Sequence, residues 1–186
     1  MRRAVAALAG VGLLVLAGAV ALTAPDDATQ QSPFAARAVV GSTAQGRTLS
    51  TEVTAVRLAR IASTGAWTGE THGVWVVAES RVTSKLAPAA LSARLRIGGV
   101  EYEPSARPGD AALDDVSLDA GLTTAGAFFF EVPRNAVTGA AAKSAVIRIQ
   151  LGADPLLDSV TDTRVDLTRL TVRATLAVDP PGLAEG

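Results

Sequence analysis

The sequence predicts an all-β domain, an antiparallel β-sandwich, preceded by one apolar N-terminal segment. Apolar and polar residues alternate in about seven short runs, and turn residues separate the runs. No segment after Ala24 has a sustained helical period of apolar residues. The 186-residue chain leaves enough sequence behind Ala24 for one domain with its own core.

Residues 1–24 form the apolar segment, which has no charged side chain after its third residue. About 20 apolar residues at about 1.5 Å each span roughly 30 Å, the thickness of a bilayer's hydrocarbon core. Arg2 and Arg3 precede the apolar run and should stay on the cytoplasmic side. We therefore expect a transmembrane helix that anchors a single-pass protein in the cell membrane, with the domain outside the cytoplasm.

A cleaved signal peptide is the alternative interpretation of the same segment. Signal peptides have a shorter apolar region followed by small residues, and Ala17-Gly18-Ala19 and Ala19-Val20-Ala21 both offer a cleavage site. The domain would then be secreted. The length of the apolar run favours the uncleaved anchor.

Three further segments follow the apolar one. Residues 25–37 are polar, without a regular period, and are expected to form a linker. Residues 38–178 carry the strand patterns. Residues 179–186 begin with Asp-Pro-Pro-Gly and are expected to form a flexible tail.

The first predicted strand covers residues 49–61, where the apolar phase slips between Ala55 and Val56. A β-bulge would explain this slip, and so would a strand that changes sheets. The next strand, residues 74–81, is apolar on both faces at first and then polar on one face. Such a pattern is typical of a strand that is buried on both sides at one end.

Residues 91–97 alternate as a half-buried strand should, and residues 100–103 follow directly after Gly98-Gly99. Two glycines between two alternating runs predict a two-residue hairpin, because glycine adopts positive φ without strain.

The C-terminal half adds shorter strands. Residues 128–132 end at Pro133, and residues 147–151 alternate next. A late strand is expected to begin at Val165, and the last one covers residues 172–178. Residues 136–144 could make one helical turn.

Together these strands resemble the exported bacterial immunoglobulin-like domains of the telokin-like type, the family that includes the mycobacterial secreted immunoprotective antigen. The resemblance is carried by Gly73-Val74-Trp75-Val76-Val77, Ile97-Gly98-Gly99-Val100-Glu101-Tyr102, Gly121 and Phe130-Glu131-Val132-Pro133. It departs at Ala120-Gly121, where the family often has Pro-Gly, and at Thr83-Ser84, where it often has Asn. The resemblance implies an immunoglobulin-like sandwich outside the cytoplasm, and it implies no site residues.

Composition excludes several classes of function. The net charge of −1 gives no electrostatic footprint for nucleic acid or for anionic lipid. The absence of cysteine excludes disulfides, thiol catalysis, thiolate metal sites and a lipid-modified cysteine. No pattern calls for a cofactor.

Catalytic and metal-binding residues are sparse. His72, the one histidine, could act as a general base beside Glu70, but no Gly-x-Ser-x-Gly presents a nucleophile. We therefore expect no enzymatic activity. Two acidic sets could bind calcium or, as is common for aspartate, could lie in solvated turns. These sets are Asp110, Asp114, Asp115 and Asp119, and then Asp154, Asp158 and Asp162.

Two aromatic residues are candidates for binding a partner. Trp67 lies in a glycine-containing segment expected to be a loop, where it could anchor a partner or fold over the end of the sandwich. Phe129 points away from its neighbours Phe128 and Phe130, so it marks an interaction patch if its face is solvated and core if that face is covered. The pattern favours core for Phe129 and for Trp75.

These observations lead to one expected function and one alternative. The expected function is a displayed module that binds a protein partner in the bacterial cell envelope. The alternative is a ligand-binding accessory protein of an envelope transporter or cell-wall system, which would need a pocket of about 300–1,000 Å³.

Overall fold

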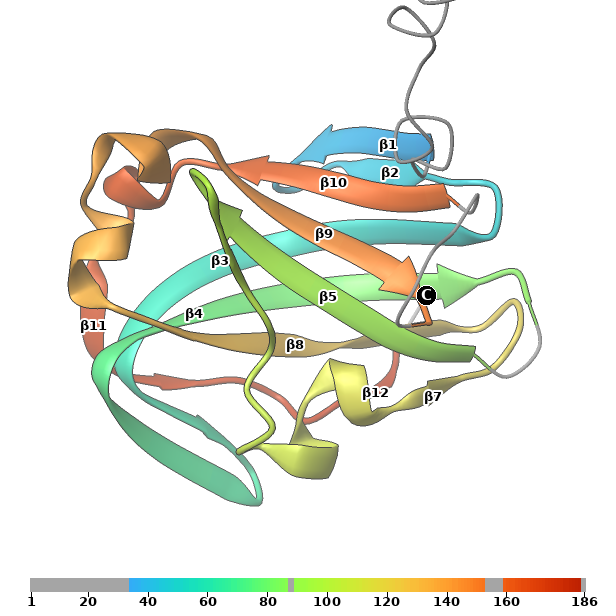
Figure 1. Ribbon diagram of the computed structural model, residues 1–186. Helices are drawn as coiled ribbons and strands as arrows, with labels where there is room; N and C mark the ends of the chain where they lie inside the picture. The colour runs from blue at the N-terminus through green and yellow to red at the C-terminus, as the bar shows by residue number, and fades with distance from the viewer. Residues whose placement is uncertain (1–33, 87–88, 153–158, 185–186) are drawn as a thin grey trace, which may run out of the picture. The chain divides into compact units, whose positions relative to one another are not determined.

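The computed structural model describes residues 34–86, 89–152 and 159–184, which form two facing β-sheets (Figure 1). The apolar segment 1–24 and all but the end of the predicted linker lie outside these residues. Among the residues that are described, no helix is long and apolar enough to cross a membrane.

Sheet A and sheet B each contain six strands in the described part of the chain. Sheet A consists of β1 (Phe34–Val39), β5 (Ala89–Ile97), β6 (Val100–Tyr102), β7 (Ser117–Leu118), β9 (Ala145–Leu151) and β10 (Ser159–Val165). Sheet B consists of β2 (Thr43–Gln45), β3 (Leu49–Thr64), β4 (Trp67–Ser84), β8 (Thr123–Val132), β11 (Val172–Ala177) and β12 (Gly182–Leu183).

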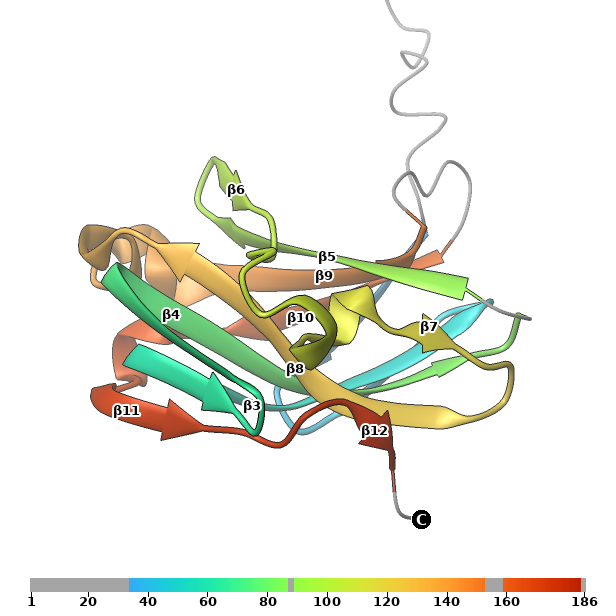
Figure 2. The same cartoon turned by 90° about the horizontal axis from the view of Figure 1, so that it is seen from below.

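The order of neighbours is β1-β10-β9-β5-β6 in sheet A, with β7 also on β5, and β11-β3-β4-β8-β12 in sheet B, with β2 also on β3. Two edge pairings, β1 with β10 and β11 with β3, are parallel, and the other pairings are antiparallel. The predicted all-β sandwich is confirmed. Figure 2 shows the two layers from the side, with sheet A above sheet B.

Five short 3₁₀ helices connect the described strands. They are η1 (Gly109–Ala111), η2 (Leu113–Asp115), η3 (Arg134–Val137), η4 (Ala140–Ser144) and η5 (Leu167–Arg169). One predicted strand start shifts as a result, while the last predicted strand, residues 172–178, is found as β11. Val165 ends β10 instead of beginning a strand, because the chain turns through η5 before β11.

The main core lies between the sheets and is filled by side chains from alternate strand positions. Leu95, Ile147, Phe128 and Phe130 are each fully buried in it. Burying such a side chain contributes about 1.5–3 kcal/mol. The space between the sheets is therefore packed with apolar side chains.

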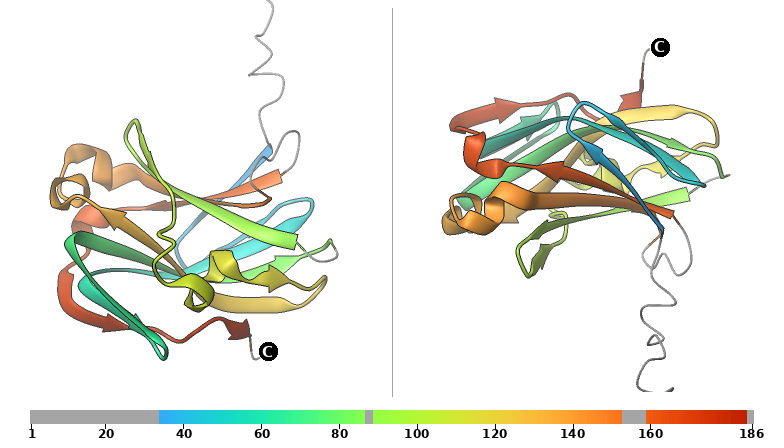
Figure 3. Two further views of the ribbon diagram at one scale, coloured as in Figure 1. Left: turned by 60° about the horizontal axis from the view of Figure 1, so that its bottom comes forward. Right: turned by 90° about the horizontal axis from the view of Figure 1, so that it is seen from above.

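The hairpin of β3 and β4 is longer than the sequence predicts and carries two irregularities. The register shifts at Thr54, close to the predicted phase slip, so of the two explanations the structure shows the β-bulge. At the second irregularity Ala59 pairs with Trp75 but Ile61 pairs with Glu70, so residues 71–74 stand opposite one residue of β3. This wide bulge bends the hairpin before its tip, residues 61–70 (Figure 3).

The hairpin of β5 and β6 is confirmed as a two-residue turn. Ile97 pairs with Val100, and Gly98 has a φ of 62°. Only the first of the two glycines has positive φ.

Two predicted boundaries differ from the structure. β1 begins at Phe34, within the segment 25–37 assigned to the linker, because parallel pairing with β10 orders it. β12 lies at Gly182–Leu183, within the predicted tail, because it pairs with β8.

Candidate functional site: the outer face of sheet B

The face of sheet B that points away from sheet A carries a second hydrophobic cluster. Strand alternation places Trp75, Val77 and Glu79 of β4 on this outer face. Their partners on β8 include Phe129, opposite Val77, and Ala127, opposite Glu79. The outer face is therefore apolar near Trp75 and becomes charged from Glu79 onward.

Three aromatic rings form the apolar end. The centroid of Trp67 lies 5.6 Å from that of Trp75 and 5.3 Å from that of Phe129, both in edge-to-face geometry. Such pairs contribute about 0.5–1.5 kcal/mol beyond the area they bury. Trp75 Nε1 donates a hydrogen bond of 2.9 Å to the Gly69 carbonyl, which fixes the hairpin tip over the sheet.

Arg107 packs against this aromatic cluster through the Trp75 ring. Its guanidinium lies 5.2 Å from the Trp75 ring centroid, in cation–π geometry. It also donates to the Glu70 carbonyl at 3.1 Å and to a Glu131 carboxylate oxygen at 3.3 Å. The Thr71 hydroxyl donates to the other oxygen of that carboxylate. The tip of the hairpin is thus held by charged groups as well as by packing.

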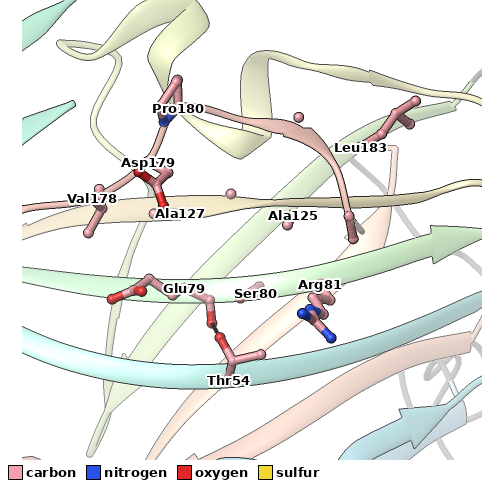
Figure 4. A pocket seen from close by; sticks show the side chains of 13 residues that line it. Thr54, Glu79, Ser80, Arg81, Ala125, Ala127, Val178, Asp179, Pro180 and Leu183 are labelled. Carbon is pink, nitrogen blue, oxygen red and sulfur yellow. Dashed lines mark hydrogen bonds between the residues drawn. The ribbon is translucent and has the colours of Figure 1, made fainter. Parts of the chain in front are cut away.

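The C-terminal segment, residues 178–184, crosses the outer face from β11 to β8. We call it the C-terminal strap, and Figure 2 shows it on the side of sheet B away from sheet A. Between the strap and the sheet lies an open groove of about 500 Å³ (Figure 4). Small residues of β8, Ala125, Gly126 and Ala127, line the groove. Asp179 and Pro180 of the strap line it as well.

Gly126 explains how closely the strap approaches the sheet. A Cβ at this position would lie 3.2 Å from the Pro181 Cα and from a methyl carbon of Leu113. A larger residue would push both neighbours away. The groove therefore depends on a small residue where the strap crosses β8.

Glu79 is the most perturbed charged group of the groove. Burial raises the pKa of its carboxyl above the ordinary 4.5, Asp179 raises this pKa further, and Arg57 and Arg173 oppose the rise. Arg57 Nη2 donates to Glu79 Oε2 at 3.1 Å, and Arg57 Nε lies 3.0 Å from Oε1. The side chain of Glu79 is 26 % exposed and lines the groove.

Arg81 supplies the opposite charge two residues further along β4. It is exposed, and it makes no ion pair with any residue that the structure describes. Figure 4 shows Glu79 and Arg81 on the strand and Asp179 on the strap. The groove thus combines two carboxylates, one guanidinium and a floor of small side chains, which suits an extended peptide with charged side chains.

The two aromatic residues proposed for partner binding meet in this face. Phe129 is fully buried, so it belongs to the outer-face cluster as core. Trp67 is half-buried and begins β4 instead of lying in a loop. It packs against Trp75 and keeps part of its surface toward solvent.

The other candidates lie apart from one another. His72 is exposed, and its ring makes no hydrogen bond with a described residue, while its carbonyl accepts from Arg134 Nε at 3.2 Å. Asp162 pairs with Arg148. In the described ranges no group of three or more His, Asp or Glu side chains could hold a metal ion. Asp154 and Asp158 lie outside the described residues.

The groove itself was not predicted from the sequence. One signal was available, because Glu79 continues the face of Trp75 and Val77 and so places a carboxylate at the end of an apolar row. The roles of Asp179 and Pro180 could not be read from a segment with the composition of a tail.

Comparison with known proteins gives no family. No protein-family model and no curated protein matches the chain. Two solved structures are similar to it at TM-scores below 0.5. An uncharacterized β-sandwich protein from Clostridium difficile has a TM-score of 0.48 and 10 % identity, covering 76 % of this chain and 99 % of that one. The yjhA protein from Bacillus subtilis has a TM-score of 0.45 and 12 % identity, covering 67 % and 98 %.

Proposed function

We propose that the protein is a non-catalytic, immunoglobulin-like module that binds a protein partner outside the cytoplasm, held at the membrane by its N-terminal apolar segment. The supporting observation for binding is the strap groove, which pairs a floor of small residues with the carboxylates of Glu79 and Asp179. Trp67 lies on the same face and offers a half-exposed aromatic surface. Partly buried aromatic and charged groups of this kind are typical of binding hot spots.

The non-catalytic role is part of the proposal and rests on the side chains that line the strap groove. Ser80 lines the groove, but its hydroxyl donates to the Ala78 carbonyl at 3.3 Å. A general base must lie within about 2.6–3.2 Å of the proton that it abstracts. His72, the base considered from sequence, does not line the groove.

Site-specific photo-crosslinking in intact cells tests this proposal. A photoreactive residue replaces Arg81 in the groove, and a control places it at Val100, which is 52 % exposed on sheet A. We expect one reproducible partner from position 81 and none from position 100. The variant Ala125→Phe, which fills the groove, should abolish the crosslink. Recovery of monomer only, or equal crosslinking from both positions, would contradict the proposal.

A ligand-binding accessory protein is the second candidate. The groove volume of about 500 Å³ falls within the range of about 300–1,000 Å³ that is usual for small-molecule sites. Native mass spectrometry of the protein extracted from membranes separates the two candidates. A bound small molecule that Ala125→Phe removes would favour the accessory protein, whereas the mass of the bare chain in both samples would exclude it.

A further inference from the structure

The outer face of sheet A carries a concentration of arginines that the net charge conceals. The register aligns Arg37 of β1, Asp162 of β10, Arg148 of β9 and Arg94 of β5 in one row across the sheet. Register partners share a face, so all four side chains belong to the side away from the core.

A second row lies beside the first. Arg164 of β10 aligns with Val146 of β9, which aligns with Arg96 of β5 and then with Glu101 of β6. We call these two rows the arginine face. Its strand positions hold five arginines and two carboxylates, a surplus of three positive charges in a chain whose net charge is −1.

Ion pairs use only part of this charge. Arg148 donates two hydrogen bonds to Asp162, at 2.8 and 2.9 Å, and Arg94 lies 3.3 Å from Glu101. The remaining three arginines, Arg37, Arg96 and Arg164, are exposed and form no ion pair with a described residue.

These three arginines also line a common depression. An open groove of about 650 Å³ is bordered by Arg37, Arg96, Arg164 and Asp162. Strands lie about 4.8 Å apart, so the four strands from β1 to β5 span roughly 15 Å. Three guanidiniums over that width, none of them in an ion pair with a described residue, match a surface of closely spaced phosphates better than a single small anion.

The length of chain before β1 indicates which anionic surface is within reach. Nine residues separate Ala24, the end of the apolar segment, from Phe34, the start of β1. A chain of that length spans at most about 35 Å and on average roughly 17 Å. Arg37 lies only three residues into β1, so in an anchored chain the arginine face is within reach of the bilayer.

We propose that the arginine face docks on anionic phospholipid headgroups of the membrane in which the N-terminal segment is anchored. This inference rests on the anchorage in the proposed function and adds an orientation to it. Docking through sheet A leaves the outer face of sheet B, with its strap groove, pointing away from the bilayer. The groove then remains open to a partner.

A fluorescence experiment on the full chain tests the docking. The chain has no cysteine, so Ser42→Cys places a single label at the edge of the arginine groove and Thr175→Cys places a control label on β11 of sheet B. Each labelled chain is reconstituted into vesicles that carry a headgroup-level quencher. One set is phosphatidylcholine, and the other contains about 30 % phosphatidylglycerol.

We expect quenching of the label at position 42, but not at position 175, in the anionic vesicles alone. Each arginine near an anionic surface contributes about a factor of five, so R96Q/R164Q should lower the ratio of docked to undocked chains about 30-fold. The control R169Q/R173Q removes the same charge elsewhere and should leave the ratio unchanged. Raising the salt from about 0.05 to about 0.5 M should reverse the quenching.

Equal quenching in neutral and anionic vesicles, or equal effects of the two double variants, would overturn the docking. A response of the label at position 42 to polyglutamate, at concentrations where anionic vesicles give none, would assign the face to an acidic protein and overturn it too. Flotation with neutral vesicles reports anchorage separately. If the chain does not float with neutral vesicles, the proposed anchorage is wrong. If it also shows no salt-sensitive binding to the anionic vesicles, the proposed docking is wrong as well.

Discussion

Gly73 is predicted to be the least replaceable glycine of the site's framework. It lies in the wide bulge of β4 that carries Trp67 back over the outer face. A Cβ at this position would lie 2.2 Å from the Val132 carbonyl oxygen, whereas ordinary contacts begin at 3.4 Å. Gly73→Ala therefore forces the backbones of β4 and β8 apart by about 1 Å.

The cost of this displacement follows from what it disrupts. Val132 is buried and pairs with Val74 in the β4–β8 ladder. Weakening one or two ladder hydrogen bonds costs about 1 kcal/mol each, and overpacking adds about 1–3 kcal/mol. We expect a loss of about 2–4 kcal/mol in the free energy of unfolding, which lowers the Tm by roughly 5–15 °C.

Thermal unfolding of the full chain in detergent, followed by circular dichroism, measures this loss. Gly65→Ala is the matched control, because nothing lies within 4 Å of a Cβ at that hairpin position. We expect its stability to change by less than about 1 kcal/mol. If Gly73→Ala is as stable as Gly65→Ala, the close approach of the bulge to β8 is wrong.

Four other single substitutions separate the roles of individual side chains. Phe129→Ala should lower the free energy of unfolding by about 3–5 kcal/mol, because the ring is fully buried. Trp67→Ala should lower it by about 1–2 kcal/mol, because that ring is only half-buried. Urea denaturation measures both losses, and the reverse order would contradict the burial of the two rings. Glu79→Gln should gain stability relative to wild type as the pH rises above 4.5, because the raised pKa means that folded Glu79 holds its proton more tightly than unfolded Glu79. Denaturation at pH 4 and pH 7 measures this, and a constant difference between the two proteins would refute it. Arg148→Gln should lower the free energy of unfolding by about 1–3 kcal/mol, because the mostly buried Asp162 carboxylate then lacks the guanidinium that donates two hydrogen bonds to it. The double variant Arg148→Gln/Asp162→Asn should recover part of that loss, because no buried charge is left without a partner.

The strands that the sequence predicts well are those whose burial differs between their two faces. Leu95 and Ile147 belong to runs in which every second residue enters the core, and this local pattern is sufficient to identify a strand. Gly98-Gly99 identifies its hairpin for the same reason, because the turn requirement is local.

Edge strands cannot be predicted from alternation of apolar and polar residues, because pairing with a neighbouring strand defines them. β1 is a strand because it lies parallel to β10, and its partners are more than 120 positions away in sequence. β12 has two residues and depends on the strap that crosses Gly126. Neither arrangement has a signature in its own residues.

The two candidate surfaces could not be predicted from the sequence for a related reason. Arg37, Arg96 and Arg164 lie far apart in the sequence, and only the strand registers place them on one face. A net charge of −1 averages over that face and over the acidic loops. Glu79 and Asp179 likewise meet only because the strap returns over β4.

Retention of the N-terminal segment is the claim on which both proposals depend. The most direct test is the intact mass of the protein in the membrane fraction and in the medium. We predict the full 18.9 kDa chain in the membrane fraction. A shortened chain that begins between Val20 and Pro25 and accumulates in the medium would contradict it.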